Sequence, residues 1–286
     1  MSESDLIQHI SDTSRWIAAY RAQESERPDA VFKDPLAARL AGERGMEMIR
    51  ATPNTEAMGF AMVVRTVAID RLVLSAVARG VDTVINLGAG LDTRPYRMPL
   101  PSTLKWIEVD FPHVITYKND LLQHEKPACS LQRIAADLSL ELERLDLFSN
   151  LDNNTKKSLI ITEGVIAYLT NTQAEQFAKD LFAMPHFYYW IMDYSQGRFR
   201  RNKQTEDLQK KMVKNTPFRF SEANPLTFFG KQGWKVAENI YMLEEADRIG
   251  RRMPVLLPWK FMRRIFPKKF RAMINNTYGY VMFSRS

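Results

Sequence analysis

Hydrophobic residues in the first eighty positions recur with the spacing of amphipathic helices. One periodic stretch runs from Leu6 to Ala22, and another follows Asp34-Pro35, where the proline suits a first helical turn. The longest stretch runs from about Ala57 to Arg79, and Gly80 is positioned to end it as a C-cap. This pattern predicts a helical cap over residues 1–80.

After Asp82 the pattern changes to short apolar runs separated by helical stretches of about 10–15 residues, which is typical of βα units and a parallel sheet. The predicted strands are Thr83–Leu87, Leu104–Val109, Leu131–Ala135, Ser158–Thr162, Phe187–Met192, Val236–Met242 and Tyr278–Phe283. We therefore expect one α/β domain over residues 1–286, with a doubly wound, mostly parallel, seven-stranded sheet. Residues 81–196 would form its ligand-binding core. Residues 197–286 would add lid-like helices, inserted before the last strand, and the last two strands.

An acidic residue closely follows each of the first five predicted strands. These residues are Asp92, Asp110, Asp137, Glu163 and Asp193. In an open α/β sheet, ligands bind beyond the carboxyl ends of the strands, where the strand order reverses. The sequence therefore predicts a polar cleft at this edge that tolerates cations.

The segment Gly88-Ala89-Gly90 follows the first predicted strand, and its glycines allow a tight turn against a ligand. A dinucleotide-binding fingerprint would have a third glycine where this chain has Thr93. That glycine lets a helix pack closely on the strand. Its absence argues against a nicotinamide-dependent dehydrogenase, an alternative that titration with NADH would test.

The next three strand ends carry groups suited to the parts of a nucleoside. Asp110, which Phe111 follows, is spaced from the glycine turn so that its carboxylate can accept both ribose hydroxyls. Asp137 offers a carboxylate to an exocyclic amine, and the backbone N–H of Leu138 suits a ring nitrogen, so this pair can read adenine. Glu163 would lie beside a sulfonium or its amino-acid tail. A carboxylate at this position tolerates a positively charged ligand group far better than it would tolerate the negatively charged pyrophosphate of a nicotinamide cofactor.

Motifs spaced along nearly the whole chain resemble those of one family. They are Asp12-Thr13-Ser14-Arg15-Trp16, Asp34-Pro35, Arg65-Thr66 with Asp70, the Gly88 loop, Glu108 to Pro112, Asp137-Leu138, Glu163 to Leu169, Gly233-Trp234 and Gly250-Arg251. In these motifs the chain resembles the leucine carboxyl methyltransferases and their bacterial relatives, the tetracenomycin-type O-methyltransferases. The resemblance implies a class I methyltransferase-like fold. It also implies S-adenosylmethionine as the methyl donor and S-adenosylhomocysteine as the product.

The resemblance further implies roles for individual residues. Arg65 and Arg15 would hold the carboxylate of the donor, and Gly88 would pack under its methionine part. The remaining donor contacts would come from Asp110 for the ribose, Asp137 and Leu138 for the adenine, and Glu163 nearby.

The methyl acceptor is less well specified. A carboxylate, with a reference pKa of about 4, needs no base, whereas a phenol, at about 10, would benefit from one. The four histidines match no base position, and only His113, beside the ribose loop, is expected near the cleft. This favours carboxylate over hydroxyl methylation of a small-molecule acceptor, with Tyr168 and Arg65 orienting it. A protein C-terminal carboxylate is the alternative that the resemblance leaves open.

Charge is unevenly distributed along the chain. Residues 1–196 hold 20 basic and 26 acidic residues, a net charge of −6, whereas residues 197–286 hold 20 and 7, a net charge of +13. The positive net charge of +7 therefore comes from the last third of the chain, and no specific nucleic-acid partner is expected. Residues 253–274 mix apolar and basic residues, which suits a packed helix, a lid over the substrate, or contact with an anionic membrane surface.

Composition excludes several other classes. With one cysteine, Cys129, the chain can form neither an intramolecular disulfide nor a cysteine-based zinc site, and no metal is expected. No run of about 18 apolar residues predicts a transmembrane helix. Because Met1 to Ile10 carries acidic residues in place of a basic, apolar leader, we expect a cytoplasmic protein.

Overall fold

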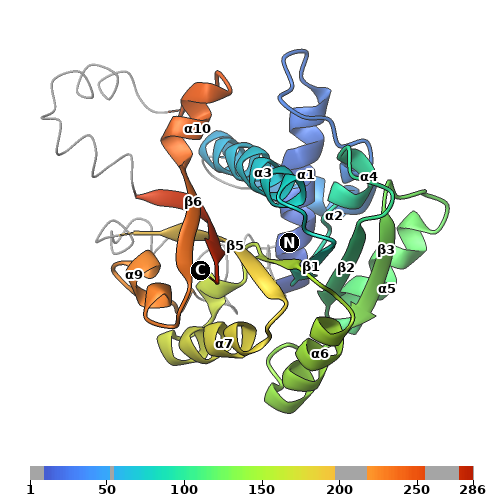
Figure 1. Ribbon diagram of the computed structural model, residues 1–286. Coiled ribbons are helices and arrows are strands. Elements are labelled where there is room, and N and C mark those ends of the chain that lie inside the picture. Colours follow the sequence, from blue (N-terminus) through green and yellow to red (C-terminus); the bar gives the residue numbers. More distant parts are fainter. Residues whose placement is uncertain (1–9, 52–54, 197–217, 255–276, 286) are drawn as a thin grey trace, which may run out of the picture.

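A seven-stranded sheet forms the centre of the molecule (Figure 1). The strand order is β3-β2-β1-β4-β5-β7-β6, with β1 to β5 parallel and β7 antiparallel to both of its neighbours. The computed structural model describes residues 10–51, 55–196, 218–254 and 277–285. Its strands are β1 (Thr83–Leu87), β2 (Lys105–Asp110), β3 (Ser130–Ala135), β4 (Ser158–Thr162), β5 (Phe187–Ser195), β6 (Lys235–Tyr241) and β7 (Tyr278–Ser284). The predicted α/β fold with a mostly parallel, seven-stranded sheet is confirmed.

Helices cover the sheet and form the cap that precedes it. They are α1 (Ile10–Glu26), α2 (Ala37–Ala51), α3 (Thr55–Ala78), α4 (Arg94–Arg97), α5 (Pro112–Leu122), α6 (Glu141–Asn153), the 3-10 turn η2 (Ile166–Tyr168), α7 (Asn171–Ala183), α9 (Pro225–Gly230) and α10 (Met242–Arg248). Figure 1 shows α3 and α10 on one side of the sheet and α6, α7 and α9 on the other. Gly80, with φ +83°, ends the long helix α3 as the sequence predicted.

The hydrophobic core lies on both faces of the sheet, because successive side chains of a strand point to opposite faces. Val84 of β1 packs in the cluster that includes α3, whereas its neighbour Ile85 packs in the cluster that includes α6 and α7. A third cluster joins α1 and α2, around Trp16 and Leu40. The cap is therefore anchored by a core of its own, next to the end of the sheet where β1 to β5 finish.

Several predicted boundaries differ from those of the structure, and two of the differences have a clear cause in the contacts. Pro35 lies in a turn before α2, which begins at Ala37; the Asp34 carboxylate, bonded to Arg21 and Thr93, holds this turn in place. Strand β5 continues three residues past its predicted end, because β7 pairs with it as far as Ser195. Asp193 therefore lies inside a strand and not in the loop after it.

The basic segment 253–274 lies, apart from its first two residues, outside the described part of the chain. Its packing, lid and membrane alternatives thus stay predictions. Within the ranges given above, the structure contains no helix that is both long and apolar enough to span a membrane.

Candidate active site

A cavity of about 570 Å³ opens at the carboxyl ends of β1 to β5. Helices α1 and α3 and the turn η2 form its other walls, with side chains such as Ile17, Met62 and Tyr168. All five acidic residues predicted at the strand ends line this cavity: Asp92, Asp110, Asp137, Glu163 and Asp193. Strand topology thus gathers groups that are up to about a hundred positions apart in the chain.

The glycine turn after β1 brings bare backbone to the cavity. Gly88 and Gly90 have φ angles of +72° and +49°, in the left-handed region. The N–H groups of Gly88 and Ala89 both donate to the Val109 carbonyl, at 2.8 and 3.1 Å. A Cβ on Gly88 would lie 2.6 Å from Val165 Cγ2. Only glycine therefore fits this turn without moving the neighbouring loop.

Replacing Gly88 with alanine is expected to lower the free energy of unfolding by about 2–4 kcal/mol, since left-handed backbone and overpacking each cost about 1–3 kcal/mol. Gly80→Ala is the matched control, because Gly80 also has a positive φ but open space around it. Urea unfolding should show a larger loss of the free energy of unfolding for Gly88→Ala than for Gly80→Ala. Adding Val165→Ala to the Gly88→Ala variant should recover part of the difference. Equal losses for the two glycine variants would contradict the clash.

The Asp110 carboxylate is held rigidly at the end of β2. Its Oδ2 accepts the Gly90 N–H at 2.6 Å, and its Oδ1 accepts the Phe111 N–H at 2.8 Å. Burial raises the pKa of Asp110, although these hydrogen bonds oppose the shift. Phe111 also lines the cavity and stacks on the His113 ring, with centroids 5.8 Å apart. The Asp110 carboxylate and the glycine turn are therefore held together by hydrogen bonds before any ligand binds.

Asp137 and Leu138 border the cavity after β3. Asp137 Oδ1 accepts two hydrogen bonds from Ser139, one from the backbone N–H at 2.9 Å and one from the side-chain hydroxyl at 2.7 Å. The Leu138 carbonyl accepts from Arg144 Nη1 at 2.9 Å. These contacts fix the loop whose carboxylate and backbone were predicted to read adenine.

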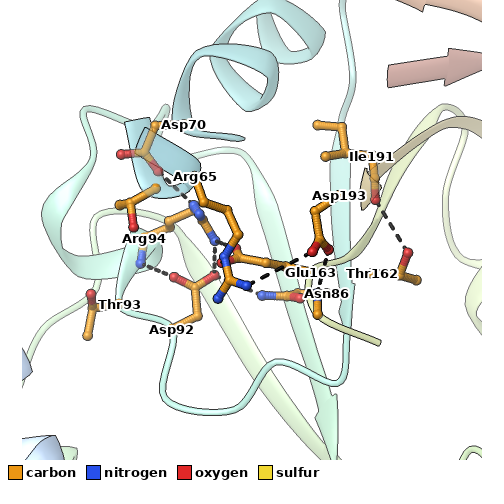
Figure 2. Close-up of polar contacts among 12 residues, drawn as sticks. Arg65, Asp70, Asn86, Asp92, Thr93, Arg94, Thr162, Glu163, Ile191 and Asp193 are labelled. Carbon is orange, nitrogen blue, oxygen red and sulfur yellow. Dashed lines mark hydrogen bonds and ion pairs between the residues drawn. The ribbon is translucent and has the colours of Figure 1, made fainter. Parts of the chain in front are cut away.

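Arg94 is the centre of a network of charged side chains (Figure 2), and it lines the cavity together with Asp92 and Glu163. Its guanidinium lies 2.7 Å from Asp70, 2.9 Å from Asp92 and 2.9 Å from Glu163, and the side chain is only 3 % exposed. Burial disfavours the charged form of Asp92, yet the adjacent Arg94 holds the pKa of that carboxyl well below its usual range. Asp92 therefore remains ionised at neutral pH.

Arg65 continues this network from α3 toward β5 (Figure 2). Its Nε lies 2.8 Å from Glu163 Oε1, whereas its Nη1 lies 4.0 Å from Asp193 Oδ2. Asp193 Oδ1 accepts the Gly164 N–H at 2.7 Å. Burial disfavours the charged form of Arg65, but the negative charges of Glu163 and Asp193 raise the pKa of Arg65 above its usual value. Burial also raises the pKa of Asp193.

Thr93, which replaces the third glycine of a dinucleotide site, fastens the cap to the sheet. Its hydroxyl donates to Asp34 Oδ2 at 2.5 Å, and Arg21 Nε donates to the same atom at 2.8 Å. Arg21 also donates to the Leu91 carbonyl at 2.6 Å. The chain then enters the short helix α4, in place of the long helix that follows the third glycine of a dinucleotide site.

Arg15 does not line the cavity, contrary to the prediction that it helps to hold the donor's carboxylate. Its guanidinium lies 4.0 Å from the centre of the Tyr117 ring of α5. Ser14 and Ile17 point into the cavity from α1, and Arg15 lies on a different side of that helix, as the helical period requires. The sequence identified the helix but not its rotation.

Tyr168 reaches the cavity from η2 and packs against Phe218, with ring centroids 5.2 Å apart. Burial raises the pKa of the Tyr168 phenol. The phenol therefore stays protonated at neutral pH and can donate a hydrogen bond.

The sequence analysis gave no role to the buried arginines of the network, Arg94 and Arg97, and named their shared partner Asp70 only as part of a motif. Arg97 lies 2.6 Å from Asp70 Oδ2. The available signal was the pair of arginines that follows the glycine turn, in Arg94-Pro95-Tyr96-Arg97, together with a carboxylate in the mainly apolar helix α3.

The cavity lining carries slightly more negative than positive charge. It includes five arginines and six carboxylates, so it suits a ligand with at least one cationic group. Among the residues that the structure describes, no cluster of three or more His, Cys, Asp or Glu side chains could hold a metal ion.

Sequence comparisons relate the chain to methyltransferases. A profile of leucine carboxyl methyltransferases matches residues 14–182. A Streptomyces coelicolor protein, assigned by inference to the S-adenosyl-L-methionine-dependent methyltransferases, is 33% identical over 57% of the chain. The match spans about three fifths (61%) of that relative's length. A Mycobacterium relative with the same kind of name is 26% identical over 88% of the chain and 91% of its own length.

Solved structures share the fold. A DUF574 family protein from Streptomyces avermitilis superposes with a TM-score of 0.61 at 15% identity, covering 96% of the chain and 97% of its own. A Thermobifida fusca protein, assigned by inference to the methyltransferases, gives a TM-score of 0.55 at 14% identity, covering 95% and 93%. At such low identity these similarities support the architecture alone.

Proposed function

Because the chain belongs to the leucine carboxyl methyltransferase family, we propose that it is an S-adenosylmethionine-dependent O-methyltransferase acting on a small molecule. The observation that carries the proposal is the convergence, in one cavity, of the Gly88 turn, the anchored Asp110 carboxylate and the Asp137-Leu138 loop. These groups come from the ends of the three adjacent strands β1, β2 and β3.

The residues present fit this donor. Asp110 has oxygens suited to the two ribose hydroxyls, and Asp137 and Leu138 suit the adenine edge. The Gly88 turn brings backbone to the cavity where the methionine part could approach it, and the carboxylates of the lining could stabilise a sulfonium. When bound, the donor would supply an electrophilic methyl carbon.

Catalysis would then rest on alignment and exclusion of water, since an in-line displacement needs little else. Part of the cavity wall is apolar and includes Ile17, Met58, Met62 and Phe218. Tyr168 can donate a hydrogen bond to an acceptor oxygen, and Arg65 can attract an acceptor carboxylate. This wall supports an apolar acceptor with a carboxylate or hydroxyl as the methylated group.

A protein C-terminal carboxylate is the second candidate, and the family match supports it. A panel of aromatic acids and phenols, assayed beside a peptide with a free C-terminal carboxylate, distinguishes the two. Methylation of the peptide alone would favour the protein substrate.

Donor binding is the first test. S-adenosylhomocysteine should bind the wild-type protein in calorimetry, and Asp110→Ala should weaken that binding about 100-fold, since hydrogen bonds to a charged group contribute about 1.5–3 kcal/mol each. Asp120→Ala is the control, because Asp120 is exposed on the nearby helix α5. Absence of binding to the wild type would reject the methyltransferase proposal.

A further inference from the structure

Gly250-Arg251 is one of the sequence motifs of this chain, yet neither of its residues lines the cavity. The two residues end helix α10. Gly250 has a φ angle of +69°, and the Arg251 N–H donates to the Ala246 carbonyl at 2.8 Å, which is the pattern of a Schellman cap. Met242 and Ala246 pack α10 into the same core cluster as α3. The backbone of Arg251 is therefore fixed relative to the core.

The side chain of Arg251 reaches from this end of α10 to the end of the cap helix α1. Its Nη2 donates to Glu24 Oε1 at 2.5 Å, and its Nη1 donates to Asp29 Oδ2 at 2.5 Å. Nη2 also donates to the Asp29 carbonyl at 2.7 Å. Hydrogen bonds from Arg27 and Arg251 lower the pKa of Asp29 to about 2, so its carboxylate stays charged at neutral pH. One guanidinium thus joins the last third of the chain to the first helix.

Glu24 depends on this guanidinium. Its side chain is only 4% exposed. Its other partners are the Val31 N–H, which donates to Oε1 at 2.8 Å, and Arg27, whose Nε lies 3.5 Å from Oε2. A buried carboxylate costs free energy unless a cation and hydrogen bonds compensate it. Without Arg251, the end of α1 would have to shift so that water could reach Glu24.

Helix α1, which carries Glu24, is in direct contact with the glycine turn. A Cβ on Gly90 would lie 3.1 Å from the Cβ of Ser14, near the start of α1. Arg21, one turn before Glu24, donates to the carbonyl of Leu91 at 2.6 Å. Leu91 directly follows Gly90 in the chain. A shift at the end of α1 would therefore be transmitted to the backbone of the glycine turn.

We propose that Arg251 is a positioning residue for donor binding, because it holds the end of α1 and α1 in turn holds the glycine turn in place. The inference rests on the proposed function, since it presumes that the glycine turn binds the donor. It makes donor affinity depend on a side chain of residues 197–286 that lies outside the cavity lining.

Calorimetry with S-adenosylhomocysteine tests this role in Arg251→Met, which removes the charge but keeps a long side chain. The affinity should fall about 3- to 30-fold, the range expected when a substitution acts on a site through its neighbours. Arg248→Met is the matched control. Arg248 also lies at the end of α10 and is 50% exposed, but its partner Glu245 belongs to the same helix, so the affinity should not change.

Glu24→Gln separates positioning from a general loss of stability. Glutamine keeps the shape of the side chain and an oxygen that can accept the Val31 N–H, but it needs no cation. Added to Arg251→Met, it should recover about threefold or more in affinity, because no unpaired buried charge remains. Urea unfolding of each variant shows that the protein is folded under the conditions of the binding assay.

The outcomes separate this inference from the proposed function. If Arg251→Met unfolds more easily but binds S-adenosylhomocysteine as tightly as the wild type, Arg251 only stabilises the fold and the inference is wrong. It is equally wrong if Arg248→Met loses as much affinity. Should Arg251→Met not fold, Arg251→Lys replaces it, since one ammonium cannot reproduce the two-pronged contact, and unchanged affinity would again reject the inference. If the wild type does not bind the ligand, the proposed function itself fails.

Discussion

Replacement of Arg94 by methionine is expected to lower the free energy of unfolding by about 3–5 kcal/mol at neutral pH and to abolish donor binding. The guanidinium is 3% exposed and contacts three carboxylates, from Asp70, Asp92 and Glu163. Methionine fills a similar volume but leaves these buried charges with fewer partners. The loss of charge, and not a cavity, should therefore dominate the effect.

The same substitution should change how stability depends on pH. In the wild type, Arg94 lowers the pKa of Asp92 below its unfolded value, so this contribution is present at neutral pH and is lost only as the pH falls far into the acid range. In the variant, burial without Arg94 should raise the pKa of Asp92. The variant can then relieve its buried charge by protonation, and the stability difference should shrink between about pH 7 and about pH 5.

Urea unfolding at several pH values measures both effects. Arg50→Met is the control, because Arg50 is 61% exposed and its partner Glu43 is 74% exposed, so that ion pair should contribute less than about 1 kcal/mol. An Arg94 variant that loses no more than the control would show that the network does not stabilise the fold.

The strand ends and their acids could be predicted because both depend on local patterns. Short apolar runs gave all seven strands, and parallel strands necessarily finish at a common edge. The positions of Asp110, Asp137 and Glu163 after their strands were therefore enough to bring them to one cavity. The glycine turn was equally visible, since a positive φ next to a close contact needs glycine.

The partners of the buried arginines could not be predicted in this way. Arg94 contacts Asp70 because of the position that α3 takes relative to the sheet, and no periodicity in the chain fixes that position. The direction of the Arg15 side chain could not be predicted for a related reason, because a shift of one residue along a helix turns the side chain by about 100°. Sequence patterns thus identified the element in each case but left the side-chain partners open.

A second large effect is expected at Glu108, a fully buried residue in the middle of β2. Its Oε1 accepts from Lys118 Nζ and its Oε2 from Arg133 Nε, each at 2.8 Å, and Lys118 is also fully buried. Glu108→Gln keeps the shape but removes the only negative charge of this trio. The free energy of unfolding should fall by about 3–5 kcal/mol at neutral pH, which chemical denaturation would measure against the exposed control Glu175→Gln.

The pH dependence of this variant has the opposite sign to that of the Arg94 variant. Burial lowers the pKa of Lys118, and the Glu108 charge raises it part of the way back, so the substitution should lower it further. A folded pKa below the unfolded value of about 10 means that the unfolded state binds more protons, and stability must then rise with pH. The deficit of Glu108→Gln should therefore shrink from about pH 7 to about pH 10. Lys118→Met should cost less, since Glu108 keeps Arg133 as its partner. If Lys118→Met costs more than Glu108→Gln, the trio is not organised around the carboxylate.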